Sequence, residues 1–168
     1  MVRRAIIGII LLLAQVTLFK DIILFNLAFC FPYILILFVL PINTNRIALL
    51  GSGFLIGLII DSFYNTPGLH AAACVLIMFL RPLWLNILLS GSNYDAGSRV
   101  SIRSMGFRWF ATYLIPLTLI HHLILFFIEA GGFNLAGITL VKVLYSTLFS
   151  FTCMVIMQYI FASESRSQ

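Results

Sequence analysis

Six apolar runs follow one another along the chain, and charged or turn-forming residues end each of them. An α-helix needs about 20 apolar residues to cross the hydrocarbon core of a bilayer. The predicted membrane-spanning helices are residues 5–24, 30–42, 47–61, 69–89, 107–128 and 137–161. Because Pro32 lies near the start of the second run and Pro41 ends it after few turns, we expect a short or tilted helix that depends on its neighbours. Residues 1–168 are therefore predicted to form a single integral membrane domain, an all-α bundle of about six helices.

The composition excludes a water-soluble domain. Hydrophobic residues make up 62% of the 168 positions and charged residues 9%, with a mean hydropathy of +1.12, whereas soluble domains average about 25% charged residues. Six helices of about 20 residues would leave too little chain for a separate soluble domain. The ten Lys and Arg residues, against five Asp and Glu, therefore have no soluble surface on which to cluster, which excludes a nucleic-acid-binding module.

The basic residues instead indicate topology. In the six-helix arrangement, seven of them fall on one side: Arg3, Arg4, Arg46, Arg99, Arg103, Arg108 and Arg166. The opposite side holds Lys20 and Lys142. By the positive-inside rule, both termini are predicted to be cytoplasmic.

The longest polar stretch, residues 90–99, separates two groups of helices and contains turn-forming residues throughout. Three arginines lie in or just after this stretch, Arg99, Arg103 and Arg108, and two roles are open for them. They could meet the headgroups of anionic lipid, or they could form a docking loop for a cytoplasmic partner.

A second polar turn is predicted on the outer side of the membrane. Asp61 ends the third apolar run, and Gly68 and His70 follow within nine residues. Asp61 could cap the next helix, or it could contact a partner or join a buried polar network. His70 could hydrogen-bond Asp61 across the turn. Gly53 and Gly57 form a G-x-x-x-G face, which we expect to pack within the chain rather than against another chain.

Arg81 is the charged residue that the sequence places deepest in the membrane. It lies eleven residues after His70, about 16 Å along a helix. Helical side chains lean toward the N-terminus of their helix, here the outer side, so snorkelling to the cytoplasmic surface is disfavoured. Arg81 could bind the Met78 carbonyl that Pro82 leaves without a donor, or it could bind a ligand.

The remaining candidates for chemistry are His121 and His122, midway along the fifth run. Adjacent helical residues point about 100° apart, so the pair is poorly placed to share a metal ion. We expect one histidine to face the bundle and bond a hydroxyl, and the other to face lipid headgroups or a partner. No metal or other cofactor is expected, and the sequence contains no recognised catalytic motif, so we predict that the chain is not an enzyme.

Several short motifs between residues 32 and 82 carry a resemblance to a known family. They are Pro32-Tyr33-Ile34, Leu40-Pro41-Ile42-Asn43, Gly57-Leu58-Ile59-Ile60-Asp61, Thr66-Pro67-Gly68-Leu69-His70-Ala71-Ala72-Ala73 and Phe79-Leu80-Arg81-Pro82. In these motifs the chain resembles the rod shape-determining membrane protein family MreD. The second half of the chain resembles the family in topology only.

The resemblance implies a non-enzymatic, multi-pass scaffold of the bacterial inner membrane that helps to maintain rod shape. The implied partners are MreC as the direct one, MreB, and the glycosyltransferase and transpeptidase that build lateral peptidoglycan. Asp61, Gly68, His70, Arg81 and Pro82 would then form a partner interface or a buried polar network. The alternative is a vitamin-type transporter's substrate-binding subunit, whose energy-coupling-factor fold is thought to be similar to MreD. In that case Arg81, His121 and His122 would line the pocket.

Overall fold

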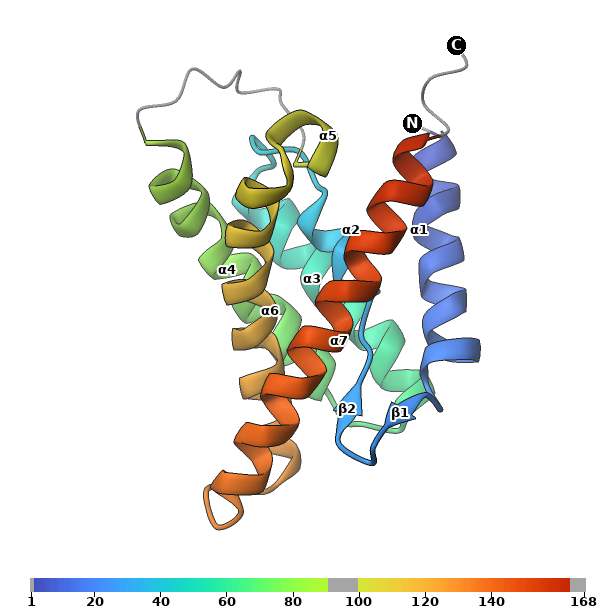
Figure 1. Ribbon diagram of the computed structural model, residues 1–168, viewed down its shortest axis with the longest axis vertical. Coiled ribbons are helices and arrows are strands. Elements are labelled where there is room, and N and C mark those ends of the chain that lie inside the picture. The colour runs from blue at the N-terminus through green and yellow to red at the C-terminus, as the bar shows by residue number, and fades with distance from the viewer. Residues whose placement is uncertain (1, 91–99, 164–168) are drawn as a thin grey trace.

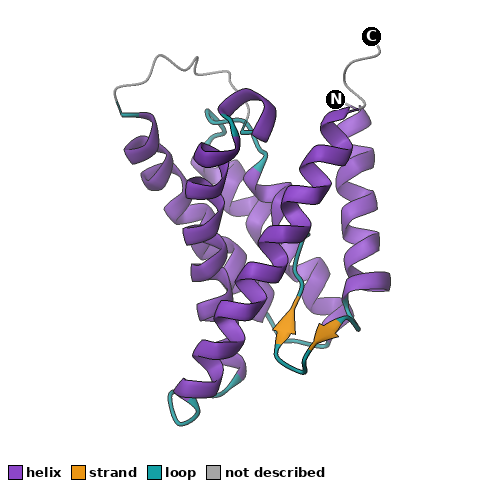
Figure 2. Cartoon of the chain, viewed as in Figure 1, coloured by secondary structure: helices purple, strands orange, loops and turns teal. Residues whose placement is uncertain are grey.

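The computed structural model describes residues 2–90 and 100–163. Helices dominate the described residues, so the all-α class is confirmed (Figure 2). The elements are α1 (Val2–Ala14), a turn of π-helix η1 (Gln15–Phe19), β1 (Ile23–Leu24), β2 (Ala28–Phe29), α2 (Ile34–Phe38), α3 (Arg46–Tyr64), α4 (Leu69–Leu89), α5 (Ile102–Met105), α6 (Phe107–Glu129) and α7 (Ala136–Ser163). Four of these helices, α3, α4, α6 and α7, are long and apolar enough to cross a membrane.

The predicted count of six spanning helices is not confirmed. The first predicted helix is present as α1 continued by η1, which is shorter than the four long helices. The second is wrong over most of its length, because only the five residues of α2 are helical there. Before α2 the chain is a two-stranded hairpin, β1 paired with β2, followed by residues 30–33, which are neither helix nor strand.

The chain runs back and forth along the bundle (Figure 1). α1 leads to the hairpin at one end, and the chain then returns through the middle of the bundle as β2, the residues after it and α2. α3, α4, α6 and α7 follow in alternating directions, so the start of α1 and the end of α7 lie at the same end. We call this end of the bundle the arginine end, because Arg46 and Arg108 lie there in the first turns of α3 and α6. We call the opposite end the hairpin end.

Two glycines of α3 bring it against α4. A Cβ atom at Gly57 would lie 2.4 Å from the Ala71 Cα, and one at Gly53 would lie 3.0 Å from the Cys74 carbonyl oxygen. Only glycine permits backbones to approach this closely. The G-x-x-x-G face therefore packs within the chain, as predicted.

Candidate functional site: a buried polar network around a non-helical segment

The candidate site is built around residues 28–33, which we call the central segment. Non-helical backbone in the middle of an apolar bundle needs hydrogen-bond partners, because no water is there to supply them. Helix α7 supplies two of them. The Phe29 amide donates to the Ser146 hydroxyl and the Phe31 amide to the Ser150 hydroxyl, both at 2.9 Å. The two serines are four residues apart, so they lie on one face of α7.

Gln15 binds the central segment from the other side. It is fully buried at the start of η1. Its side-chain amide nitrogen donates to the Cys30 carbonyl at 3.1 Å and to the Tyr64 hydroxyl at 2.8 Å. Its carbonyl oxygen accepts from the Tyr33 amide at 3.4 Å. One amide side chain thus links the first helix, the central segment and the end of α3.

The Tyr33 hydroxyl contacts three side chains from two helices, α4 and α6. It lies 2.9 Å from His70 Nδ1, 3.0 Å from His121 Nε2 and 3.5 Å from Cys74 Sγ. A hydroxyl has one proton to donate and two lone pairs, so it can bond both imidazoles when one of them presents an N–H and the other a bare nitrogen. This cluster therefore fixes the central segment to both α4 and α6.

The prediction that one of the two adjacent histidines faces outward is wrong. His121 and His122 are both fully buried, and their ring centroids are 5.5 Å apart. α6 packs between α4 and α7, so two directions about 100° apart both point into the bundle. His121 turns to Tyr33, whereas His122 approaches Ser150 at 3.4 Å, and His121 Nδ1 has no partner among the described residues.

Asp61 is buried and caps α4. One carboxylate oxygen accepts from the His70 amide at 2.9 Å and from the Thr66 hydroxyl at 2.6 Å, and the other accepts from the Ala71 amide at 2.9 Å. A carboxylate is stabilised there by the free amides and the positive end of the helix dipole. The prediction that the His70 side chain bonds Asp61 is wrong, because its ring turns inward to Tyr33 and only its backbone amide meets the carboxylate.

Arg81 is fully buried and holds the end of α2. Its Nε donates to the Tyr113 hydroxyl at 2.7 Å, and its terminal nitrogens donate to the carbonyls of Phe38, Leu40 and Pro41. Free carbonyls at a helix C-terminus attract a cation. The guanidinium therefore bonds the end of α2 and not the Met78 carbonyl, the first of the two alternatives, because the side chain extends away from its own helix.

The other predicted site residues are spread over the structure. Gly68 precedes α4 with φ of +85°, a conformation that glycine adopts without strain. Pro82 lies inside α4, and Arg103 and Arg108 are exposed at the arginine end. Arg99 lies outside the described residues, as do most of residues 90–99. The three residues of the alternative pocket are not brought together: Arg81 bonds α2 and Tyr113, while the histidines bond Tyr33 and α7.

The hairpin end has exposed aromatic side chains and an exposed ion pair. Phe25, at the turn between the two strands, is 88% exposed, and Phe133, between α6 and α7, is 79% exposed. Lys142 donates to Glu129 at 2.7 Å and lies over the rings of Phe29 and Phe126. This ion pair joins the end of α6 to the first turns of α7.

Sequence reasoning missed Gln15, Ser146 and Ser150 as members of the network. A signal was present, because the two serines lie four residues apart in an apolar run and Gln15 interrupts another. Among the described residues no group of three His, Cys, Asp or Glu side chains could hold a metal ion. The arrangement that is present holds a non-helical segment inside a helical bundle.

No protein-family model, curated protein or solved structure matches the chain. The class of protein is therefore given by the structure itself. Four apolar helices long enough to cross a membrane are consistent with a multi-pass membrane protein.

Proposed function

We propose that the chain is a non-enzymatic, MreD-like scaffold of the bacterial cell-elongation machinery, which maintains rod shape by organising lateral peptidoglycan synthesis with MreC and MreB. One observation carries the proposal: motifs that are separate in the sequence contact one another. Tyr33 of the first motif bonds His70 of the fourth, and Arg81 of the fifth bonds the Leu40 and Pro41 carbonyls of the second. Asp61 of the third motif binds amides of the fourth.

Contact among the motifs supports the resemblance for a physical reason. Residues that jointly hold a non-helical segment in place must be kept as a set, because removing one leaves a buried polar group of another without a partner. On this proposal the motif residues build the fold, and partners bind its outer surfaces.

The charges at the two ends support the proposed orientation in the bacterial inner membrane, with both termini cytoplasmic. Arg46, Arg103 and Arg108 lie at the arginine end, whereas Lys20 and Lys142 lie toward the hairpin end. This asymmetry follows the positive-inside rule. The hairpin end would then face the periplasm.

The hairpin end is the proposed contact surface for MreC. Asp61 and His70 are buried, whereas Phe25 at the turn of the hairpin is highly exposed. Exposed aromatic side chains are typical centres of protein interfaces. The arginine end would remain available to MreB, and the membrane-exposed helix faces to the glycosyltransferase and transpeptidase.

Depletion of the chain in its own host tests the function. We expect the cells to lose their rod shape and to stop directing new wall material to the lateral surface, as followed by a fluorescent wall label. Re-expression of the wild-type chain restores both. Rod-shaped growth with normal lateral labelling after depletion would overturn the proposal.

A variant tests the contact surface. Phe25→Ala should reduce MreC co-purification at least tenfold, since truncating a central aromatic at an interface costs about 2 kcal/mol or more. Phe54→Ala is the matched control, because Phe54 on α3 is 50% exposed but lies away from the hairpin. Equal MreC recovery with both variants would exclude Phe25 from the interface.

A further inference from the structure

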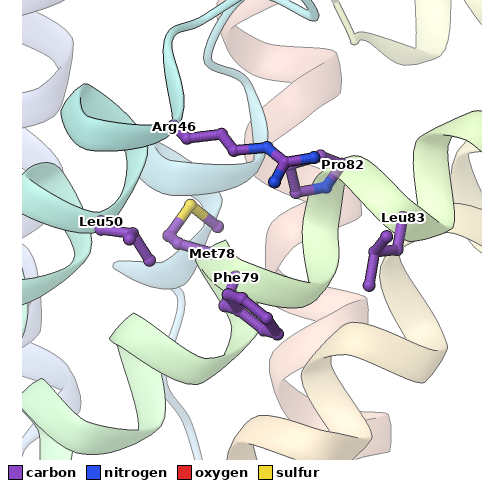
Figure 3. Close-up of a pocket in the computed structure, with 6 residues that line it drawn as sticks. All are labelled: Arg46, Leu50, Met78, Phe79, Pro82 and Leu83. Carbon is purple, nitrogen blue, oxygen red and sulfur yellow. The ribbon is translucent and has the colours of Figure 1, made fainter.

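A groove lies between the first turns of α3 and the second half of α4. Its volume is about 270 Å³, and it is lined by Arg46, Leu50, Met78, Phe79, Pro82 and Leu83. Figure 3 shows Arg46 extending from the start of α3 toward Pro82 on α4, with the apolar side chains beside it. The groove is thus apolar along its length and cationic at its edge.

The sequence explains why the helices separate at this point. Gly57 and Gly53 lie on the face of α3 that meets α4. A Cβ at Gly57 would lie 2.4 Å from the Ala71 Cα, and one at Gly53, a turn nearer the arginine end, would lie 3.0 Å from the Cys74 carbonyl oxygen. The two helices therefore move apart toward the arginine end. Larger side chains, Leu50 and Met78, follow the glycines there and line the groove.

Arg46 brings a positive charge to a place that already favours anions. It is exposed and has no hydrogen-bond or ion-pair partner among the described residues. It occupies the first turn of α3, where Asn45 caps only the Ile47 amide, so other amides there are free to meet an anion. A guanidinium binds phosphate through two parallel hydrogen bonds.

We propose that this groove binds one anionic phospholipid, with its phosphate on Arg46 and an acyl chain along Leu50, Phe79 and Leu83. The positive charge at the edge of the groove matches the phosphate of such a lipid, and the apolar lining matches its acyl chain. Phe79 and Leu83 are 57% and 50% exposed, and α3 and α4 are both long enough to cross the membrane. The groove would therefore open to the bilayer with its cation at the level of one surface. A single guanidinium matches a single phosphodiester better than a diphosphate. The proposal does not depend on the scaffold function.

The test uses the purified full-length chain with a photoactivatable acyl chain on phosphatidylglycerol or phosphatidylethanolamine. Cross-linked peptides are identified by mass spectrometry. For the wild type we expect labelling of the α4 peptide that contains Phe79 and Leu83, stronger with phosphatidylglycerol. Arg46→Gln should reduce phosphatidylglycerol labelling there about fivefold, the effect expected for one basic residue near a membrane surface.

Two further variants distinguish the site from general effects. Arg108→Gln removes the same charge at the same end but from α6, outside the groove, and should leave the labelling unchanged. Leu83→Trp should fill the groove and reduce labelling without changing any charge. The proposal is overturned if Arg46→Gln and Arg108→Gln act equally, if both lipids label this peptide equally, or if an isoprenyl diphosphate displaces phosphatidylglycerol at equal concentration.

Discussion

Replacing Ser150 by alanine removes a single hydroxyl group from the polar network and leaves the rest of the side chain in place. That hydroxyl accepts the Phe31 amide at 2.9 Å, and it lies 3.4 Å from both the Phe29 carbonyl and His122 Nε2. Alanine leaves the Phe31 amide buried without an acceptor. Such an orphaned group costs about 1–3 kcal/mol, so we expect Ser150→Ala to destabilise the fold by about 2 kcal/mol, or about 30-fold in the unfolding equilibrium.

The assay is reversible unfolding of the purified chain in mixed micelles by increasing dodecyl sulfate, followed by circular dichroism. Thr152→Ala on the same helix is the matched control. The Thr152 hydroxyl is exposed and donates to the Leu148 carbonyl of its own helix, so its loss should change the stability by less than about 0.5 kcal/mol. The reasoning fails if the two variants unfold at the same detergent concentration, because the Phe31 amide would then not depend on Ser150.

Two other sets of substitutions test the packing of α3 against α4 and the bonds of Arg81 to the end of α2. Gly57→Ala should destabilise the chain by about 3 kcal/mol or more, because its Cβ would meet the backbone of α4 at 2.4 Å. Gly68→Ala should cost only about 1–2 kcal/mol, because its φ is positive but its surroundings are open. The same unfolding assay measures both, and an equal or reversed ranking would contradict the close approach of α3 and α4. Arg81→Met should lower the free energy of unfolding by about 2–4 kcal/mol, since the carbonyls at the end of α2 lose their donor. Arg81→Lys should restore part of the lost stability in a thermal-unfolding measurement. Full stability of the methionine variant would exclude the proposed role of the guanidinium.

Apolar runs predicted the four long helices closely, because a helix surrounded by lipid satisfies its own backbone and needs only length and hydrophobicity. The same rule failed at residues 30–42. Part of their backbone is satisfied by side chains from elsewhere, Ser150, Gln15 and Arg81, and hydropathy carries no information about such long-range bonds.

The candidate site could be predicted in its members but not in its pairings. Asp61, His70 and Arg81 stand out as polar residues in or beside apolar helices, and all three are buried. Their partners depend on which helices are neighbours and how they are rotated. The sequence therefore suggests Asp61 as a partner for His70, and a carbonyl of its own helix or a ligand for Arg81, whereas the structure pairs His70 with Tyr33 and Arg81 with the end of α2.

The most direct test of the proposed function is affinity purification of the tagged chain from its native membranes in mild detergent, with identification of the co-purifying proteins. The scaffold proposal predicts MreC together with the glycosyltransferase and transpeptidase of lateral wall synthesis. Recovery of a pair of ATPase subunits with a bound small molecule, without MreC, would contradict it and would identify the chain as a transporter subunit.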